Sequence, residues 1–211
     1  MEARVILKMN LKTTMTHYDL LIDEDHDPVY DSEMLQQYMN RWDGDVFLQA
    51  LQLCDDSVVL EIGVGTGRLA ICVLNEGCKQ FVGVDLSKKT IHRAQHNLES
   101  FYNYELIIGD YLTVNFKQTF DIIYSSLTFF HIEDKETAFQ KTWSMLKEYG
   151  QFVLSIEKST PNYLCYGDYA VRMFPDDYRE TITYMSNCNF NIERVIETSH
   201  AYIIVAKKRV K

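Results

Sequence analysis

Residues 58–67 constrain the fold of this chain more than any other stretch. They read as an apolar strand, Val58 to Ile62, that runs directly into a glycine-rich turn and then a helix. Three of the nine glycines of the chain lie in this turn, and glycine permits positive φ angles and a close approach of a ligand to the main chain. The pattern therefore predicts an α/β fold with a ligand at the carboxyl end of a parallel sheet.

An acidic residue, Glu61, lies at the end of this first strand. In P-loop and dinucleotide sites the glycine turn places a helix N-terminus against phosphate, and a carboxylate inside the turn would repel that ligand. The turn is therefore better suited to an uncharged or cationic ligand.

Two further apolar strands also end in an acid. Residues 81–84 lead into Asp85, and residues 106–108 lead through a glycine into Asp110. An acid at the position of Asp85 in a βαβ unit binds ribose hydroxyls. A fourth strand, residues 120–124, leads into residues 125–131, so the sequence predicts four strand ends at one ligand site.

Over residues 55–157 these landmarks resemble the class I (seven-strand) S-adenosylmethionine-dependent methyltransferases. The resemblance implies a three-layer Rossmann-like sandwich, with a seven-stranded, mostly parallel sheet of order 3-2-1-4-5-7-6 and strand 7 antiparallel. It implies S-adenosylmethionine as cofactor, S-adenosylhomocysteine as product and methyl transfer as the reaction. One departure is Tyr149, which replaces a glycine in the turn before strand five.

The resemblance also assigns site residues. It implies that Glu61 and the turn after it wrap the methionine part of the cofactor, that Asp85 holds the ribose diol, that Asp110 takes the adenine amino group and that Tyr111 flanks the ring. The cofactor-binding residues that we expect are Tyr18, Glu61, Gly63, Gly65, Thr66, Gly67, Asp85, Leu86, Gly109, Asp110, Tyr111, Ser125 and Ser126.

Histidine 131 follows strand four, where the resemblance places the methyl group. With an ordinary pKa of about 6.5 it is the candidate general base for the acceptor proton. The alternative, that His131 orders the loop before the next helix, stays open. Tyr18 likewise has two interpretations, a lid over the cofactor or aromatic packing. The acceptor-binding residues that we expect are Trp42, Tyr163, Tyr166 and Arg172.

Charge and motifs favour a small-molecule acceptor. The chain has 30 acidic and 21 basic residues, a net charge of −9, whereas nucleic-acid binding needs clustered Lys and Arg. The basic run at residues 207–211 reads as a solvated surface. Residues 125–128 lack the proline-containing motif of methyltransferases that modify base nitrogens, and no cysteine adjoins a proline as cytosine C5 methylation requires.

Cysteine usage and hydropathy bear on the compartment. Five scattered cysteines without a C-x-x-C pair argue against a disulfide framework and a zinc site, and fit a reducing cytoplasm. No apolar run approaches the roughly 20 residues of a membrane helix, and residues 1–8 are too short an apolar stretch for a signal peptide. We expect no metal, no membrane partner, and a monomer or homodimer.

The chain is expected to form a single domain, residues 1–211. Residues 1–54 would be an N-terminal extension and helices that form a lid, and residues 55–211 the cofactor-binding catalytic core. Residues 1–16 read either as a mobile extension or as part of the lid. Beyond strand five we expect an irregular segment at residues 157–176, a helix at 177–185 and a hairpin of strands at 192–197 and 201–206.

Two other functions remain as alternatives. One is a catalytically silent protein that binds the cofactor and acts as a partner subunit. The other is an NAD-dependent Rossmann oxidoreductase, which also uses a glycine turn and a ribose-binding acid. The dinucleotide pattern G-x-G-x-x-G differs from the spacing found here, and a pyrophosphate would meet Glu61.

Overall fold

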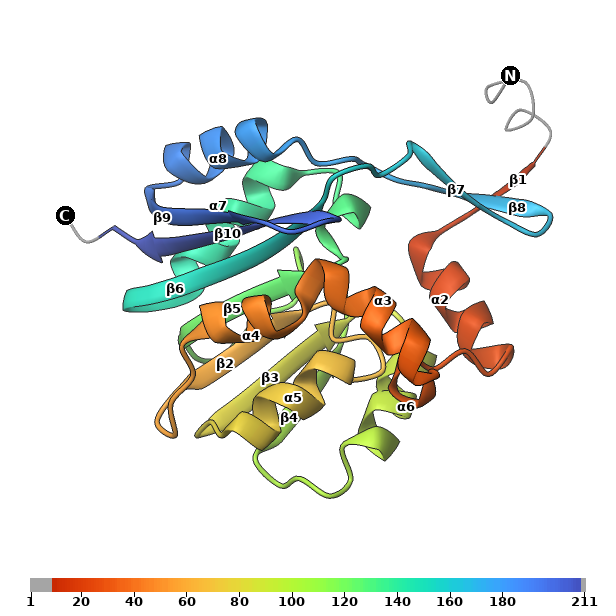
Figure 1. The fold of residues 1–211 in the computed structure, drawn as a ribbon, viewed down its shortest axis with the longest axis horizontal. Coiled ribbons are helices and arrows are strands. Elements are labelled where there is room, and N and C mark those ends of the chain that lie inside the picture. The colour runs from red at the N-terminus through yellow and green to blue at the C-terminus, as the bar shows by residue number, and fades with distance from the viewer. Residues whose placement is uncertain (1–8, 210–211) are drawn as a thin grey trace.

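The computed structural model describes residues 9–209 of the 211-residue chain. Residues 1–8, which belong to the predicted N-terminal extension, and residues 210–211, which end the basic C-terminal run, lie outside the described residues. The described part contains a seven-stranded sheet with helices on both faces and a small three-stranded sheet beside it (Figure 1). Between residues 9 and 209, no helix is long and apolar enough to cross a membrane.

The large sheet has the strand order β4-β3-β2-β5-β6-β10-β9. Neighbours from β4 to β6 are parallel, whereas β10 is antiparallel to both β6 and β9. Counted along the chain this is 3-2-1-4-5-7-6 with the seventh strand antiparallel, so the predicted fold class is confirmed. The strands are β2 (Val58–Ile62), β3 (Gln80–Asp85), β4 (Tyr104–Ile108), β5 (Phe120–Ser126), β6 (Leu146–Glu157), β9 (Phe190–Glu197) and β10 (Ala201–Lys208).

Two hydrophobic cores lie on the two faces of this sheet. Every residue of β2 is buried, and Val59 joins one core while Leu60 joins the other, because successive side chains of a strand point to opposite faces. Such a continuous apolar run is typical of a parallel strand covered on both sides. One face packs against α4 (Asp45–Leu51), α5 (Arg68–Glu76) and α6 (Lys88–Asn97), and the other against α7 (Lys135–Met145) and α8 (Tyr178–Asn187).

Polar residues cap the start of three of the helices. The side chains of Ser32, Ser87 and Asp134 each accept a hydrogen bond from the backbone N–H three residues on, at 3.4, 3.0 and 3.0 Å. These bonds satisfy N–H groups that have no partner within the helix. Gly44 separates α3 (Glu33–Asp43) from α4.

The segment expected to be irregular, residues 157–176, contains a hairpin, so that prediction is wrong. Strands β7 (Tyr163–Tyr166) and β8 (Tyr169–Arg172) pair antiparallel, and β1 (Asn10–Lys12) pairs parallel to β8. The two-residue connection begins with Gly167 at a φ of 55°, which a tight hairpin turn requires. The signal was a Gly-Asp pair between two apolar runs, and the abundance of tyrosine obscured it.

Helix α2 (Thr14–Asp23) and the short 3-10 helix η1 (Pro28–Tyr30) connect the small sheet to the rest of the molecule (Figure 1). The carboxylate of Asp19 accepts from Ser87 Oγ at 2.6 Å, and Lys89 Nζ pairs with Asp23 at 2.6 Å. Within residues 9–16, β1 pairs with β8, and Thr14 Oγ1 lies 3.4 Å from Nδ1 of His131. A part for these residues in a lid stays a prediction. The division into 1–54 and 55–211 stays a prediction.

Strand β6 runs from Leu146 to Glu157. Tyr149, which stands where the resembling family has glycine, adopts a φ of 63° with its side chain 75% exposed. A non-glycine residue in the left-handed region costs conformational energy, and the exposed ring avoids adding a steric clash. The departure from the family pattern thus affects this turn, which lies at the opposite end of β6 from residues 155–157.

Candidate functional site

A cavity of about 780 Å³ lies at the carboxyl ends of β2, β3, β4 and β5. The chain runs from β2 outward to β3 and β4 and then returns to place β5 on the other side of β2. Ligands of open α/β sheets bind where the strand order reverses in this way. The expected site residues that line the cavity are Tyr18, Glu61, Gly63, Gly65, Thr66, Asp85, Leu86, Gly109, Asp110, Tyr111, Ser126 and His131.

The glycines of the turn after β2 have different functions. A Cβ atom on Gly63 would lie 2.0 Å from Thr128 Oγ1, so only glycine lets the turn pack beneath the loop after β5. Gly65 has a φ of 56°, and a Cβ there would meet no atom within 4 Å. Gly67 begins α5, packs near Leu98 and does not line the cavity.

The carboxyl group of Glu61 is buried in the wall of the cavity. Its Oε2 accepts a hydrogen bond from Tyr124 Oη at 2.9 Å. Burial raises the pKa of Glu61 well above its ordinary value, and the nearby carboxylates of Asp43 and Asp85 raise this pKa further, while Tyr124 and Arg68 oppose the shift. The ionised form of Glu61 would therefore be stabilised by a cationic ligand.

Asp85 ends β3 with both oxygens engaged. Oδ2 accepts from the Gly65 N–H at 3.0 Å and Oδ1 from the Ser87 N–H at 2.9 Å. Burial raises the pKa of Asp85, and the two backbone hydrogen bonds limit that rise. The carboxylate is thus held in one orientation between the glycine turn and the start of α6.

Asp110 and Tyr111 follow β4 on the far side of the cavity. Asp110 is exposed, and its Oδ1 accepts from the Leu112 N–H at 2.8 Å. Tyr111 is buried, and its hydroxyl lies 2.7 Å from Thr142 Oγ1. Burial raises the pKa of Tyr111, so its hydroxyl stays neutral and its ring forms a fixed wall.

The two serines at the end of β5 are placed differently. Ser126 lines the cavity, whereas Ser125 does not, because its hydroxyl donates to the carbonyl oxygen of Ile62 at 2.8 Å. Ser125 thus links β5 to β2 beneath the site, and its structural position gives no support to direct ligand contact.

A buried ion pair, which the sequence analysis missed, also lines the cavity. Arg68 Nη2 lies 2.6 Å from Asp43 Oδ2, and Ser126 Oγ donates to the same oxygen at 2.6 Å. Asp43 is 1% exposed, although it ends α3 far from the glycine motif in sequence. Its position directly after the apolar stripe of α3 was the only available signal.

His131 lies in η2 (Phe129–His131) and contacts α2 through both ring nitrogens. Nε2 lies 2.9 Å from Tyr18 Oη, and Nδ1 lies 3.4 Å from Thr14 Oγ1. Burial lowers the pKa of His131 to about 4, helped by the nearby charges of His17 and Lys135. The imidazole is therefore neutral at pH 7, and its contacts are those of a residue that links η2 to α2. A base role stays a prediction.

Tyr18 thus lies in the wall of the cavity, on a helix that contacts both α6 and the small sheet. On the small-sheet side, His17 Nδ1 lies 2.8 Å from the hydroxyl of Tyr169. Tyr30, by contrast, is 67% exposed and does not line the cavity. The geometry fits a lid formed by α2.

The residues expected to bind the acceptor do not line this cavity. Tyr163 and Arg172 line a second cavity of about 430 Å³, which shares Glu133 and Phe174 with the first. Arg172 lies 3.5 Å from Glu133 and stacks over the Phe174 ring. Tyr166 donates its hydroxyl to Glu24 at 2.7 Å on the outside of the hairpin.

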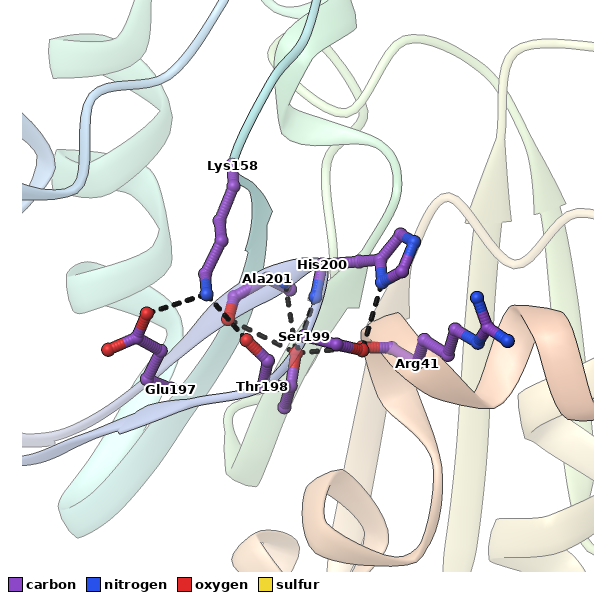
Figure 2. A network of polar contacts seen from close by, with 7 residues as sticks. All are labelled: Arg41, Lys158, Glu197, Thr198, Ser199, His200 and Ala201. Carbon is purple, nitrogen blue, oxygen red and sulfur yellow. Dashed lines mark hydrogen bonds and ion pairs between the residues drawn. The ribbon is translucent and has the colours of Figure 1, made fainter.

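Trp42 lines neither cavity, because it packs beneath the turn between β9 and β10. Its ring lies 4.6 Å from the ring of His200. Figure 2 shows how this turn is held: Thr198 Oγ1 donates to the carbonyl oxygen of Arg41, and Lys158 pairs with Glu197. Trp42 therefore connects α3 to the sheet edge.

Residues 9–209 contain no group of three or more His, Cys, Asp or Glu side chains placed to hold a metal ion. Asp121, the acid of β5, accepts from the Val58 N–H at 2.8 Å and pairs with Lys147 at 2.7 Å. It therefore has a structural role outside the cavity.

Comparison with known proteins agrees with this geometry. Residues 59–150 match the family model described as a methyltransferase domain. An uncharacterized methyltransferase of Alkaliphilus oremlandii is 32% identical over 108 residues, which are 50% of this chain and 48% of that protein. The chain spans about half or less of the length of the curated relatives that it matches.

Solved structures show the same fold. The N-methyltransferase NodS from Bradyrhizobium japonicum WM9, in complex with S-adenosyl-L-homocysteine, matches with a TM-score of 0.73 and 15% identity, over 94% of this chain and 100% of that one. The cyclase SpnF matches with a TM-score of 0.75 and 13% identity, over 96% and 99%. Residues 59–150 match the methyltransferase domain family, and the fold is that of the class I S-adenosylmethionine-dependent methyltransferases.

Proposed function

We propose that this protein is an S-adenosylmethionine-dependent methyltransferase that acts on a small-molecule acceptor. The observation that carries the proposal is the order of groups around the main cavity: the glycine turn with Glu61 after β2, Asp85 after β3 and Asp110 after β4. The match of residues 59–150 to the methyltransferase domain family supports it.

The residues present fit this cofactor. Gly65 leaves open space where a Cβ atom would stand, which allows a ligand to approach the turn. Asp85 is fixed by two backbone N–H groups in the place where an acid binds a ribose diol. Oδ1 of Asp43 and Oγ1 of Thr66 are buried without a hydrogen-bond partner among residues 9–209, and both residues line the cavity.

Charge distinguishes this cofactor from a dinucleotide. Arg68 is the one Arg or Lys among the described lining residues, and it is paired with Asp43. The carboxylate of Asp85 raises the pKa of Glu61 and so adds to the cost of ionising it. A pyrophosphate would add negative charge to this cavity, whereas the positive sulfur and ammonium of S-adenosylmethionine offset it.

The chain's own residues would position the reactants and exclude water. When bound, the cofactor supplies a methyl group on a positively charged sulfur, so the protein need not supply a nucleophile. Helix α2 covers the cavity through Thr14 and Tyr18, and the loop after β5 forms the opposite wall. Holding two reactants in attack geometry contributes up to about 7 to 11 kcal/mol in favourable cases. Neutral His131 offers the site a proton acceptor of low basicity.

The acceptor wall combines apolar and polar groups. Leu127, Ile132 and Phe174 line the cavity beside His131 and Thr14. This lining favours a small, partly apolar acceptor over a charged polymer. We infer a monomer or homodimer that acts in the cytoplasm without nucleic acid, as the sequence predicts.

Isothermal calorimetry tests the cofactor. We expect wild-type protein to bind S-adenosylmethionine and S-adenosylhomocysteine with micromolar affinity and to give no heat with NAD. Asp85→Asn should weaken the binding of both ligands by about tenfold or more, since it removes a charged hydrogen-bond acceptor. Asp121→Asn, a matched change in an acid outside the cavity, should bind like wild type. Heat with NAD alone would overturn the proposal.

The second candidate is a silent partner subunit that binds the cofactor without transferring its methyl group. The likeness in fold to the cyclase SpnF favours keeping it, because a protein named for another reaction has the same fold. A screen of amine, hydroxyl and thiol acceptors separates the two. Formation of S-adenosylhomocysteine with any acceptor supports the enzyme, whereas binding without turnover, together with co-purification of a larger enzyme, supports the subunit.

A further inference from the structure

Only one of the two carboxylate oxygens of Asp43 has hydrogen-bond partners among residues 9–209. Oδ2 receives hydrogen bonds from Arg68 and Ser126, both at 2.6 Å. Oδ1, in a side chain with no exposed surface, has no hydrogen-bond partner among residues 9–209. Leaving a buried charged oxygen unpaired is costly, so such an oxygen in a cavity wall points to a donor brought by the ligand.

The position of Asp43 adds to this cost. It is the last residue of α3, and the C-terminal end of a helix carries partial negative charge. The carboxyl groups of Asp43 and Asp85 both act on Glu61, while Arg68 is the one described cation in the same wall. Packing alone gives no reason for a buried acid here. A cationic group in the cavity would stabilise the whole cluster.

The groups beside Asp43 indicate which part of a ligand would bind next to it. Asp43 contacts Ser126 at the end of β5 and Arg68 at the start of α5, directly after the glycine turn. A guanidinium and a carboxylate oxygen side by side complement the carboxylate and ammonium of an α-amino acid. Asp85, which would hold the ribose, lies on the next strand, β3.

We propose that Asp43 is a specificity-determining residue that accepts a hydrogen bond from the α-ammonium group at the amino-acid end of the cofactor. The inference rests on the proposed function and deepens it, because it places an N-terminal helix in cofactor recognition. Arg68, on the other side of the pair, would face the cofactor's carboxylate.

Three thioether ligands separate the possible roles of Asp43. S-adenosylhomocysteine carries both ammonium and carboxylate, its decarboxylated analogue S-adenosyl-3-thiopropylamine keeps the ammonium, and 5′-methylthioadenosine has neither. Calorimetry with wild type, Asp43→Asn and the matched control Asp121→Asn compares them. Asp43→Asn should weaken the first two ligands by about ten- to a hundredfold and leave 5′-methylthioadenosine within twofold.

Two outcomes would overturn the inference and leave the proposed function standing. Equal weakening of all three ligands would make Asp43 a structural residue. Weakening of S-adenosylhomocysteine alone would mean that Asp43 acts through Arg68 on the carboxylate. Wild-type protein that binds none of the three would refute both the inference and the proposed function.

A measurement on wild type keeps the test decisive if Asp43→Asn does not fold. S-adenosyl-3-thiopropylamine and 5′-methylthioadenosine share the adenosyl thioether, and the former extends it by an aminoalkyl group. Wild type should prefer S-adenosyl-3-thiopropylamine by tenfold or more. This preference should fall when the amine is acetylated, and equal affinity for the amine and its acetylated form would refute recognition of the ammonium.

Discussion

The hydroxyl oxygen of Tyr18 lies 2.9 Å from Nε2 of His131, so the helix over the cavity is bonded directly to the loop after β5. Tyr18 belongs to α2 and His131 to η2, and both line the cavity. Burial keeps the hydroxyl of Tyr18 protonated by raising its pKa, and keeps His131 neutral. The neutral pair therefore links α2 to η2 without burying a charge.

Removing this hydrogen bond should loosen the lid. In Tyr18→Phe we expect faster amide exchange across α2 and an affinity for S-adenosylhomocysteine reduced by about fivefold, because a hydrogen bond of this kind contributes about 1 kcal/mol. Hydrogen exchange followed by mass spectrometry measures the first effect and calorimetry the second. Tyr30→Phe, on an exposed ring, is the control and should change neither. Unaltered exchange in Tyr18→Phe would contradict the link.

The lowered pKa of His131 predicts acid sensitivity. Folding holds the pKa of this side chain at about 4, while the unfolded chain titrates near 6.5. Between these values the unfolded state binds more protons, so stability rises with pH and is lost as pH falls from about 6.5 to 4. The loss is at most about 3 kcal/mol. His17, whose pKa burial also lowers, contributes in the same direction.

Urea unfolding at about pH 7.0, 5.5 and 4.5 measures how the folding stability depends on pH. His131→Gln, which can still bond Tyr18 and Thr14, should be less sensitive to acid than wild type. Identical pH profiles for the two proteins would mean that His131 keeps an ordinary pKa. The same variant tests the base role: turnover that keeps its pH profile on a confirmed acceptor would leave His131 as a residue that orders the loop.

Gly65 and Gly167 form a matched pair. Their φ angles are 56° and 55°, and a Cβ atom on either would meet no atom within 4 Å. Substituting alanine should therefore cost each a similar amount, about 1 to 2 kcal/mol, from backbone strain. Only Gly65 lines the main cavity, so only Gly65→Ala should also abolish cofactor binding. Thermal unfolding measures the loss of stability, and calorimetry measures cofactor binding. Equal cofactor binding by Gly65→Ala and Gly167→Ala would show that the glycine turn is not part of the cofactor site.

Sequence reasoning succeeded where a strand leads directly into a functional residue. Glu61, Asp85 and Asp110 follow recognisable apolar strands, and parallel topology brings strand ends to one edge of the sheet. The fold class and the order of strands came from the family resemblance that these landmarks carry. The placement of these acids needed no knowledge of long-range packing.

Sequence reasoning failed for residues whose burial or placement depends on tertiary contacts. Apart from its place after the apolar residues of α3, nothing local separates Asp43 from the many exposed acids, because its burial depends on α3 packing near α5 and the end of β5. Likewise, Trp42 has its ring against His200 and not in a cavity. Arg172 faces a second cavity because β8 pairs with both β1 and β7, a pairing that the sequence did not reveal.

A buried ion pair in the wall of the second cavity provides the last prediction. Lys135 Nζ lies 2.8 Å from Asp176 Oδ1, with side chains 13% and 3% exposed, and also donates to the Phe174 carbonyl oxygen at 3.0 Å. Removing one partner leaves an uncompensated buried charge, so Lys135→Met should cost about 3 to 5 kcal/mol of folding stability. The double variant Lys135→Met/Asp176→Leu should cost less than the single change, because no charge is left buried.

The exposed pair of Lys89 and Asp23 is the control, and breaking it should cost under about 1 kcal/mol. A double-mutant cycle from urea unfolding measures both pairs, and equal coupling energies would show that burial of the Lys135 pair does not control its contribution.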